Sequence, residues 1–406
     1  MEIRPVSTEE FPAFLRTTQG AFHEDVSDDD VASWAAVFEP ERSLAVFDDG
    51  TMVATAAALT RELTIPGASM SAACITAVGV LPTHRRRGLL TELMRRQVDD
   101  IRAAGEPVAT LWASEPTIYA RFGYGLAARH GSATVPTTGA RLRAGVPAPE
   151  GRTVLMEPAD AVARIAPLYD RVRRERIGHL DRAGAWWKLR VHDPEAHRGG
   201  RGALRAAVHE TPDGTVDGYA LYGVKLDWDD GGPNSVVIVR ELVTDGPAAV
   251  AGVWSYLLGL DLTRSVESWP YAPDLHPAEF IEGPQRPKMS LGANLWIRLV
   301  DVDAALAART YNAPFEVVFE VEDAFCPWNT GRHRLVWDGA VATCEPTEDA
   351  PDLALDVAEL GAAYLGGTSL AALAAVGRVR ELRPGALAPV SLAFRTAREP
   401  WCPEMF

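Results

Sequence analysis

Strands and amphipathic helices alternate in the hydrophobic pattern of the first 135 residues. Residues 43–47 and 52–57 are apolar runs on either side of Asp48-Asp-Gly50, and this turn sequence predicts a β-hairpin. Residues 88–102 predict an amphipathic helix, because apolar side chains recur there at helical spacing. These apolar positions are Leu90, Leu93, Met94 and Val98. The same reasoning predicts strands at 75–80 and 108–112 and a short helix at 116–122 that Gly123 ends.

Two stretches rich in proline and glycine divide the rest of the chain, at 144–151 and at 276–287. We therefore expect three domains: 1–145, 146–285 and 286–406. The middle segment repeats the order of elements of the first, with helices predicted near 162–176 and 248–260 and strands near 203–209, 218–224 and 235–242. The last segment predicts strands at 295–300, 315–321, 333–337 and 341–344 and then helices at 356–364 and 369–375, an α+β arrangement.

The turn between the strand at 75–80 and the helix at 88–102 carries the strongest chemical signal. It contains three arginines and then Gly88 at the start of the helix. The free N–H groups and the partial positive charge of a helix N-terminus favour a bound pyrophosphate. Gly88 lets the backbone approach a phosphate closely. Three arginines alone would indicate a solvated surface, but the strand, glycine and helix around them favour a phosphate-binding turn.

Composition narrows the functional classes. The 406 residues are 47% hydrophobic, and 40 Lys and Arg against 55 Asp and Glu give a net charge of −15. This balance argues against general nucleic-acid binding and is compatible with a cationic substrate. No run of about 18 apolar residues predicts a membrane span, and Met1-Glu-Ile-Arg-Pro lacks a secretory core. The four cysteines lack metal-ligand spacing, so we expect reduced thiols, no metal and a cytoplasmic protein.

Three segments resemble the enhanced intracellular survival (Eis) branch of the GCN5-related N-acetyltransferases (GNAT): residues 78–91, the sequence ASEPTIYARFGYG at 113–125, and the final Phe406. The resemblance implies a fold that is α/β and α+β, with a catalytic GNAT domain, a degenerate GNAT-like domain and a sterol-carrier-like domain. It also implies acetyl-CoA as cosubstrate. The residues that it assigns to acetyl-CoA are Val78, Gly79, Val80, Arg85, Arg86, Arg87, Gly88, Leu89, Leu90, Thr91, Ser114 and Glu115.

Acetyl transfer from a thioester to an amine needs a neutral amine, a donor for the oxyanion and a proton for the leaving thiolate. The resemblance implies that Tyr119 supplies that proton, and the backbone N–H near Val78 is the expected oxyanion donor. Tyr124, five residues later, is the rival, and its place after the helix stop indicates an aromatic of the core or of the cavity lip. The resemblance further implies that the terminal carboxylate of Phe406 is the general base. The end of the chain is apolar and contains two prolines, a composition that is not typical of a frayed tail. The alternative is a tail that only packs on its own domain.

The acceptor is predicted to bind beside residues 21–30, with Trp34 one turn further on. The resemblance assigns an aromatic and an acid of this region to the substrate, and Phe22, Glu24 and Trp34 match these roles. Glu404 stands near the position where the family has an acid, and Met405 occupies that position. The acidic run at 28–30 also has a purely structural interpretation as a helix N-cap. A cationic amine is expected, aminoglycosides foremost, with lysine side chains and polyamines as alternatives.

Two functional classes follow. The first is an acetyl-CoA-dependent N-acetyltransferase, which the resemblance implies to be a homohexamer. The second is a degenerate relative that binds acyl-CoA or lipid, or serves as a scaffold. Tyr119, Arg86, Gly88 and the aromatic end of the chain favour the first class.

Overall fold

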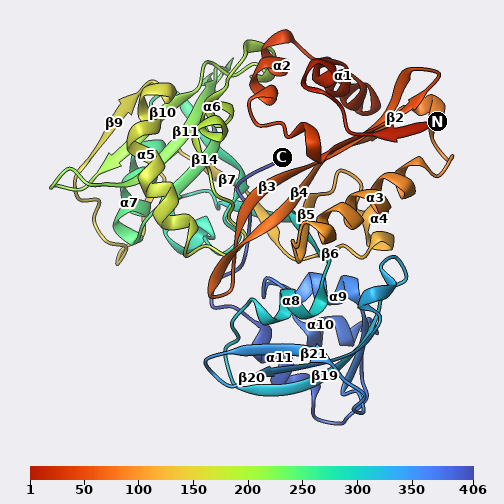
Figure 1. The fold of residues 1–406 in the computed structure, drawn as a ribbon. Helices are drawn as coiled ribbons and strands as arrows, with labels where there is room; N and C mark the ends of the chain where they lie inside the picture. The colour runs from red at the N-terminus through yellow and green to blue at the C-terminus, as the bar shows by residue number, and fades with distance from the viewer. The chain divides into compact units, whose positions relative to one another are not determined.

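The computed structural model describes residues 1–406 and contains two compact units (Figure 1). One unit comprises Met1–Ala128, Ile177–Leu180 and Ala293–Phe406, and we call it the catalytic unit because it contains most of the domain that the resemblance implies to be catalytic. The middle unit comprises Arg129–Arg176 and Asp181–Gly292. The expected boundaries at 145 and 285 differ from this division. Residues 129–145 belong to the middle unit, and the amino- and carboxyl-terminal parts of the chain form one unit.

The catalytic unit is built on a seven-stranded sheet in the order β1-β2-β3-β4-β5-β18-β6. Its strands are β1 (Glu2–Arg4), β2 (Ser43–Asp48), β3 (Thr51–Ile65), β4 (Ala68–Val80), β5 (Val108–Trp112), β18 (Leu295–Leu299) and β6 (Gly125–Leu126). The predicted hairpin is confirmed as β2 and β3, which pair antiparallel around the turn at Asp49 and Gly50.

Helices cover both faces of this sheet (Figure 1). They are α1 (Phe11–Phe22), α2 (Asp28–Ala35), α3 (Leu89–Ala103) and α4 (Pro116–Tyr119). Successive residues of a strand point to opposite faces. Ala45 accordingly belongs to the core under α1, with Phe11 and Phe14. Its neighbour Val46 belongs to the core under α3, with Leu93.

A β-bulge in β4 opens the sheet between β4 and β5. Thr55 of β3 pairs with Gly79 and Ala57 pairs with Thr76, so β4 carries one extra residue at this point, and Ala77 has a φ of 53°. The hydroxyl of Thr55 donates to the carbonyl of Ala77 at 2.8 Å. Beyond the bulge, β4 no longer pairs with β5, because their parallel register covers only residues 73–75 and 109–111. One edge of the end of β4 is thereby left free for a ligand.

The carboxyl-terminal part of the catalytic unit is an α+β layer. Its sheet has the order β21-β20-β19-β22-β23. The elements are α8 (Val302–Ala307), β19 (Phe315–Glu322), β20 (Gly331–Trp337), β21 (Ala342–Pro346), β22 (Leu353–Asp356), α9 (Val357–Ala363), α10 (Leu370–Ala375), β23 (Val379–Glu381) and α11 (Leu387–Phe394). The predicted strands and helix pair of this region are confirmed, whereas α8, β22, β23 and α11 were not predicted.

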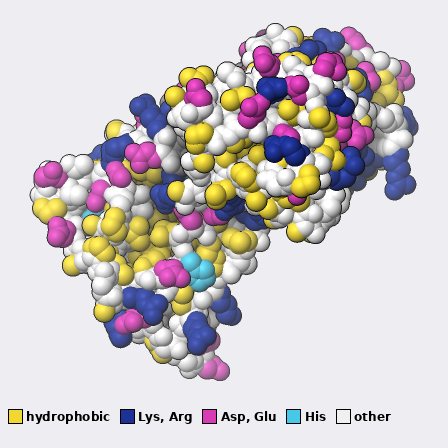
Figure 2. Space-filling model, turned by 90° about the horizontal axis from the view of Figure 1, so that it is seen from below, with side chains coloured by type: hydrophobic (Ala, Val, Ile, Leu, Met, Phe, Trp, Pro, Cys, Tyr) yellow, Lys and Arg dark blue, Asp and Glu magenta, His cyan; other side chains and the backbone are white.

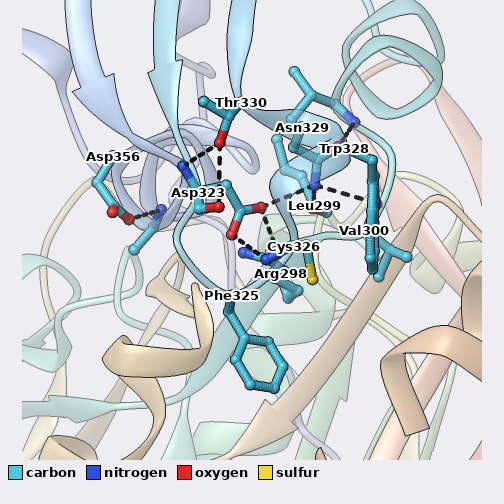
Figure 3. Close-up of polar contacts among 12 residues, drawn as sticks. Arg298, Leu299, Val300, Asp323, Phe325, Cys326, Trp328, Asn329, Thr330 and Asp356 are labelled. Atoms are coloured by element: carbon cyan, nitrogen blue, oxygen red, sulfur yellow. Dashed lines mark hydrogen bonds and ion pairs between the residues drawn. The ribbon is translucent and has the colours of Figure 1, made fainter. Parts of the chain in front are cut away.

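A buried ion pair ties this layer to the catalytic sheet (Figure 3). Arg298 of β18 donates to Asp323 at 2.5 Å, and both side chains are fully buried. Asp323 also accepts from the Cys326 backbone N–H at 2.9 Å and from the Asn329 amide at 3.0 Å. If alanine replaced Gly123, its Cβ would lie 1.6 Å from the Arg298 guanidinium. Only glycine therefore fits at this position.

The middle unit is a second seven-stranded sheet in the order β17-β7-β15-β14-β11-β10-β9. Its strands are β7 (Arg129–Pro136), β9 (Arg152–Met156), β10 (Arg205–Glu210), β11 (Val216–Lys225), β14 (Ser235–Thr244), β15 (Thr263–Tyr271) and β17 (Lys288–Ala293). Its helices are α5 (Pro158–Arg173), α6 (Gly184–Val191) and α7 (Pro247–Leu258). Short ribbons pair β8 (Arg141–Leu142) with β16 (Ile281–Glu282) and β12 (Trp228–Asp229) with β13 (Gly232–Pro233).

Acidic and basic side chains are interspersed with apolar ones on the face shown in Figure 2. The net charge of −15 therefore does not concentrate one sign on this face. Among the helices, none combines the length and the apolar composition that a membrane crossing requires.

Candidate active site

The arginine-rich turn forms a concave backbone loop at the start of α3. Arg86 and Gly88 both have left-handed φ values, 63° and 83°, and Gly88 is the N-cap residue of the helix. Left-handed residues in such a turn direct successive N–H groups inward and make an anion-binding concavity. A Cβ built on Gly88 meets nothing within 4 Å, so the space in front of the loop is open.

This loop opens into a cavity of about 640 Å³, which we call the cofactor cavity. Its walls include most of the residues that the sequence assigned to acetyl-CoA: Val78, Gly79, Val80, Arg85, Arg86, Gly88, Leu89, Leu90, Thr91, Ser114 and Glu115. The free edge of β4 is part of these walls. Arginine and histidine side chains outnumber the one carboxylate, so the lining is suited to a polyanion.

The three arginines of the turn have different positions. Arg85 donates to the Ala21 carbonyl at 3.1 Å and to the Val80 carbonyl at 3.3 Å, which fixes the turn against the end of α1. Arg87 is not part of the cavity wall, and its guanidinium lies 3.9 Å from the Asp48 carboxylate. The structure therefore does not place Arg87 with the other predicted residues. The reason is local, since Asp48 at the end of β2 attracts its charge.

The wall of the cofactor cavity also contains His84, Ile118 and Arg121, which were not predicted as site residues, and Ala21, which was expected only beside the acceptor. Arg121 stands in the recognised IYARFGY segment, two residues after Tyr119. The positive charge of Arg121, so close in sequence to Tyr119 and to Ser114 and Glu115, was the signal that could have assigned this residue to the phosphate-binding site. Nothing in the pattern of residues indicated Ile118.

Tyr119 lies at the junction of two cavities. It is 7% exposed at the end of α4, and burial together with the Glu115 carboxylate raises its pKa to about 12. Tyr124 is fully buried, lies in neither cavity wall and contacts Tyr119 edge-on at 6.0 Å between ring centroids. The interpretation of Tyr124 as a core aromatic is confirmed.

We call the second cavity, of about 360 Å³, the acceptor cavity, because Phe22, Glu24 and Trp34, which were predicted to meet the acceptor, line it. It shares Phe22, Val78, Ser114 and Tyr119 with the cofactor cavity, so the two spaces meet at the phenol. Its walls are largely aromatic. The rings come from Phe11, Phe14, Phe22, Trp34, Phe38, Trp112, Tyr119 and Phe406. Four of these rings, Phe11, Phe14, Phe38 and Trp112, were not predicted, and the first two of them lie on α1, which was not recognised as a helix.

Only one acidic side chain, Glu24, lines the acceptor cavity. The acidic run at 28–30 has the structural role that was considered as an alternative. The Ser27 hydroxyl accepts from the Asp30 backbone N–H at 3.1 Å, and the Asp30 carboxylate accepts from the Ser27 N–H at 3.1 Å. This is a capping box at the start of α2.

The end of the chain reaches this cavity. Met405 and Phe406 both line it, together with Phe22, Trp34 and Tyr119. Glu404 is only 5% exposed and lies outside the cavity wall, so the structure does not place its carboxylate with Glu24. The Glu404 side chain is instead buried close to the Cys402 thiol, whose pKa its charge helps to raise.

Comparison with known proteins agrees with this architecture. Family models described as Acetyltransferase (GNAT) domain match residues 2–127 and 178–298, and one described as Sterol carrier protein domain matches residues 302–403. An uncharacterized N-acetyltransferase of Streptomyces avermitilis is 47% identical over 92% of this chain and 91% of its own length. The N-acetyltransferase Eis of Mycobacterium tuberculosis is 31% identical over 92% of this chain and 91% of its own length.

Solved structures show the same correspondence. The crystal structure of Eis1 from Mycobacterium abscessus covers 100% of both chains with a TM-score of 0.85 and 31% identity. A GCN5-related N-acetyltransferase from Anabaena variabilis superposes with a TM-score of 0.83 at 19% identity and covers 100% of both chains, which shows a shared fold. The expected order of two acetyltransferase-like domains and a sterol-carrier-like domain is thus confirmed.

Proposed function

Because this chain belongs to the Eis group of GNAT N-acetyltransferases, we propose that it transfers the acetyl group of acetyl-CoA to an amine bound in the acceptor cavity. The observation that carries the proposal is the shared wall of the two cavities, with Tyr119 at their junction. A thioester held in one cavity and an amine held in the other would meet beside the phenol. Such a juxtaposition supplies the proximity that acyl transfer needs.

The cofactor cavity offers each part of acetyl-CoA a suitable partner. The backbone concavity at Arg86 and Gly88, with the positive end of α3, would hold the pyrophosphate. The free edge of β4 from Val78 to Val80 would pair with the amide groups of the pantetheine arm in the manner of an added strand. Ser114 and Glu115 would complete the walls near the thioester.

Tyr119 would act as the general acid. Its pKa of about 12 keeps the phenol protonated at any physiological pH. A thiol in water has a pKa of about 8.5, so proton transfer from this phenol to a solvated thiolate would be uphill. Burial in the same apolar surroundings raises a thiol pKa as well, and the Cys326 thiol in this core has a pKa raised to about 11 by burial. The difference in pKa between the phenol and the leaving thiol is therefore smaller at the site, where the proton moves as the C–S bond breaks. The backbone N–H of Val78 would stabilise the oxyanion.

The terminal carboxylate of Phe406 would act as the general base. Phe406 lines the acceptor cavity, where the amine must lose a proton to attack. A carboxylate is a weak base in water, with a pKa of about 3.5. In general, burial in apolar surroundings raises the pKa of a carboxyl group and lowers that of an amine, which narrows the difference between them. Removing Phe406, or extending the chain beyond it, should abolish turnover and leave acetyl-CoA binding intact. Wild-type turnover in the extended chain would reject this assignment.

The acceptor would be a cationic amine. Aminoglycosides are the class that the family resemblance favours, and Glu24 with the Phe406 carboxylate would contact their ammonium groups. The aromatic walls favour a second candidate, an amine carried on a single apolar or aromatic body, because one acidic side chain among many rings matches one ammonium better than several.

Thiol release from acetyl-CoA, measured against a panel of amines, tests the proposal. The panel contains aminoglycosides, polyamines, lysine peptides and aryl-alkyl amines, and mass spectrometry identifies the acetylated product. Turnover with at least one class, lost in Tyr119→Phe, is expected. Binding of acetyl-CoA by calorimetry without turnover across the panel would instead favour a degenerate acyl-CoA-binding or scaffold protein.

We also propose that the protein assembles as a homohexamer in the cytoplasm, where acetyl-CoA is available as cosubstrate. Sedimentation velocity tests the assembly, with six copies of the 43.9 kDa chain as the expected species. A monomer or dimer at micromolar concentration would contradict it.

A further inference from the structure

The last residues of the chain are held by an amide clamp at Asn294. The Asn294 side chain donates from Nδ2 to the Cys402 carbonyl at 3.0 Å and accepts at Oδ1 from the Cys402 backbone N–H at 2.7 Å. One carboxamide thus satisfies both main-chain groups of Cys402. Asn294 and Cys402 are both fully buried, so neither hydrogen bond competes with solvent.

A second anchor lies at the preceding residue. The Trp401 backbone N–H donates to the Ile177 carbonyl at 3.1 Å. Gly178, with a φ of 93°, contacts the Trp401 backbone so closely that an added Cβ would lie 2.7 Å from its carbonyl oxygen. The His179 and Trp401 rings pack edge-on, with centroids 5.3 Å apart. Three backbone groups of Trp401 and Cys402 are therefore fixed from two sides.

Both anchors stand where the chain passes between units. Ile177 begins the short segment 177–180 that interrupts the middle unit, and Asn294 follows directly after the last residues of that unit. The second acetyltransferase-like unit carries no arginine-glycine turn of the kind found at Gly88. Residues next to two of the four points where the chain passes between the units nevertheless supply the groups that hold the tail.

Only four residues separate the clamp from the end of the sequence. Fully extended, four residues span about 14 Å at most, and Pro403 restricts one of them further. Met405 and Phe406 line the acceptor cavity within that reach. The position of Cys402 thus limits where the last two side chains can lie.

We propose that Asn294 is a positioning residue, whose clamp on Cys402 holds Met405 and Phe406 in the wall of the acceptor cavity. For its effect on turnover the inference rests on the function proposed above for the Phe406 carboxylate. Asn294 lines neither the cofactor cavity nor the acceptor cavity. Asn294 acts through the backbone of the tail, and Gly178 contributes to the same positioning through its contact with the Trp401 backbone.

Two variants of the full-length chain test the clamp from opposite sides. Asn294→Asp keeps the acceptor for the Cys402 N–H but replaces the donor by an oxygen that faces the Cys402 carbonyl. Gly178→Ala inserts a methyl group against Trp401. Asn312→Ala is the matched control, because Asn312 also donates to a main-chain carbonyl of the same segment, that of Arg395, but far upstream of the clamp.

The first measurement is the reactivity of the Cys402 thiol in a Cys344→Ser background, because Cys344 is the one cysteine that is not buried. Release of the tail should raise the rate of modification by an aromatic disulfide by about tenfold in both variants, as expected for loss of one hydrogen bond. The control should react as the parent does. Unchanged Cys402 reactivity in both variants, each folded by thermal melting, would overturn the clamp.

The second measurement is steady-state kinetics with an acceptor from the amine panel. Displacement of the tail should lower kcat by about 10- to 100-fold and leave the KM for acetyl-CoA unchanged, a split that general destabilisation would not produce. A released tail with wild-type kcat in both variants would overturn the positioning role. Wild-type kcat in a chain without Phe406 would instead reject the proposed base, while the Cys402 result would still decide the clamp.

Discussion

Tyr119 illustrates how a residue acquires a role from its position. Its hydroxyl-bearing ring is buried at the junction of two cavities, whereas the ring of Tyr124, 6.0 Å away, lies wholly in the core. We expect Tyr119→Phe to lower kcat by about 10²- to 10⁴-fold, the usual contribution of a positioned acid, with acetyl-CoA affinity unchanged. Tyr124→Phe is the matched control and should retain kcat. Equal losses in both variants would show that packing, and not proton donation, is responsible.

The raised pKa of Tyr119 makes a separate prediction for the pH profile. Its phenol would ionise near pH 10 in an unfolded chain, but burial and Glu115 raise the pKa to about 12 in the fold. A raised pKa means that the protonated acid persists as pH increases. The alkaline decline of kcat should therefore lie above pH 10 in the wild-type enzyme. A decline centred at or below pH 9 that disappears in Tyr119→Phe would contradict the raised value.

Glu24 is the acidic side chain in the wall of the acceptor cavity. Glu24→Gln removes one charge without changing the shape of the wall, so the KM for a cationic acceptor should rise by about 5- to 30-fold, equivalent to about 1–2 kcal/mol for one charge-assisted contact. The KM for acetyl-CoA should not change. Asp28→Asn, an exposed position in the neighbouring helix, serves as control. If both substitutions shift the acceptor KM equally, long-range charge and not contact is the cause.

At the scale of elements, the turn into α3 depends on backbone geometry. Gly88 has a φ of 83°, which costs a residue with a side chain about 1–2 kcal/mol. Gly88→Ala should therefore destabilise the protein by that amount and also weaken acetyl-CoA binding, because the new methyl group enters the open space before the loop. Gly105→Ala is a matched control just past the other end of α3, with a φ of 73° and equally free surroundings. Gly105→Ala should lower the stability by the same amount and leave the affinity for acetyl-CoA unchanged. Denaturant unfolding measures the stability, and calorimetry measures the affinity.

Elements with local signals were predicted well. The hairpin of β2 and β3 follows from its turn sequence, and α3 buries Leu93, Met94 and Val98 as its periodicity indicates. The bulge at Ala77 could not be predicted, because it depends on the register with β3 and on the hydrogen bond from Thr55. Helix α1 was missed although it lines the acceptor cavity. Its glycine and phenylalanine residues weaken a propensity-based assignment that tertiary packing overrides.

At the scale of the whole molecule, the Arg298–Asp323 pair connects the catalytic sheet to the sterol-carrier-like layer. Asp323→Ala leaves a buried, uncompensated guanidinium, and we expect a loss of about 3–5 kcal/mol in unfolding free energy. Glu316→Ala removes a half-exposed partner of Arg334 and should cost less than about 1 kcal/mol. Chemical denaturation measures both. Similar small losses would mean that the layer is held by apolar packing alone.

Strand membership of the two large sheets shows why a linear division of the chain differs from the fold. Strand β18 was expected to begin the last domain, yet it pairs with β5 and β6 of the first sheet. Strand β7, expected in the first domain, pairs with β15 of the middle unit. Each exchange joins residues more than a hundred positions apart, and the proline- and glycine-rich stretches give no information about such pairing.

The sequence by itself determined the family, the order of the domains and the turn at Gly88, because these depend on short segments whose residues act on their own backbone. Only the tertiary structure decided which side chains share a cavity. It separated Arg87 and Glu404 from the residues they were grouped with, placed Tyr124 in the core, and brought the rings of α1 together with Met405 and Phe406. The physical reason is that contacts between distant segments depend on sheet register, bulges and buried hydrogen bonds such as those of Asn294. No local pattern encodes these interactions.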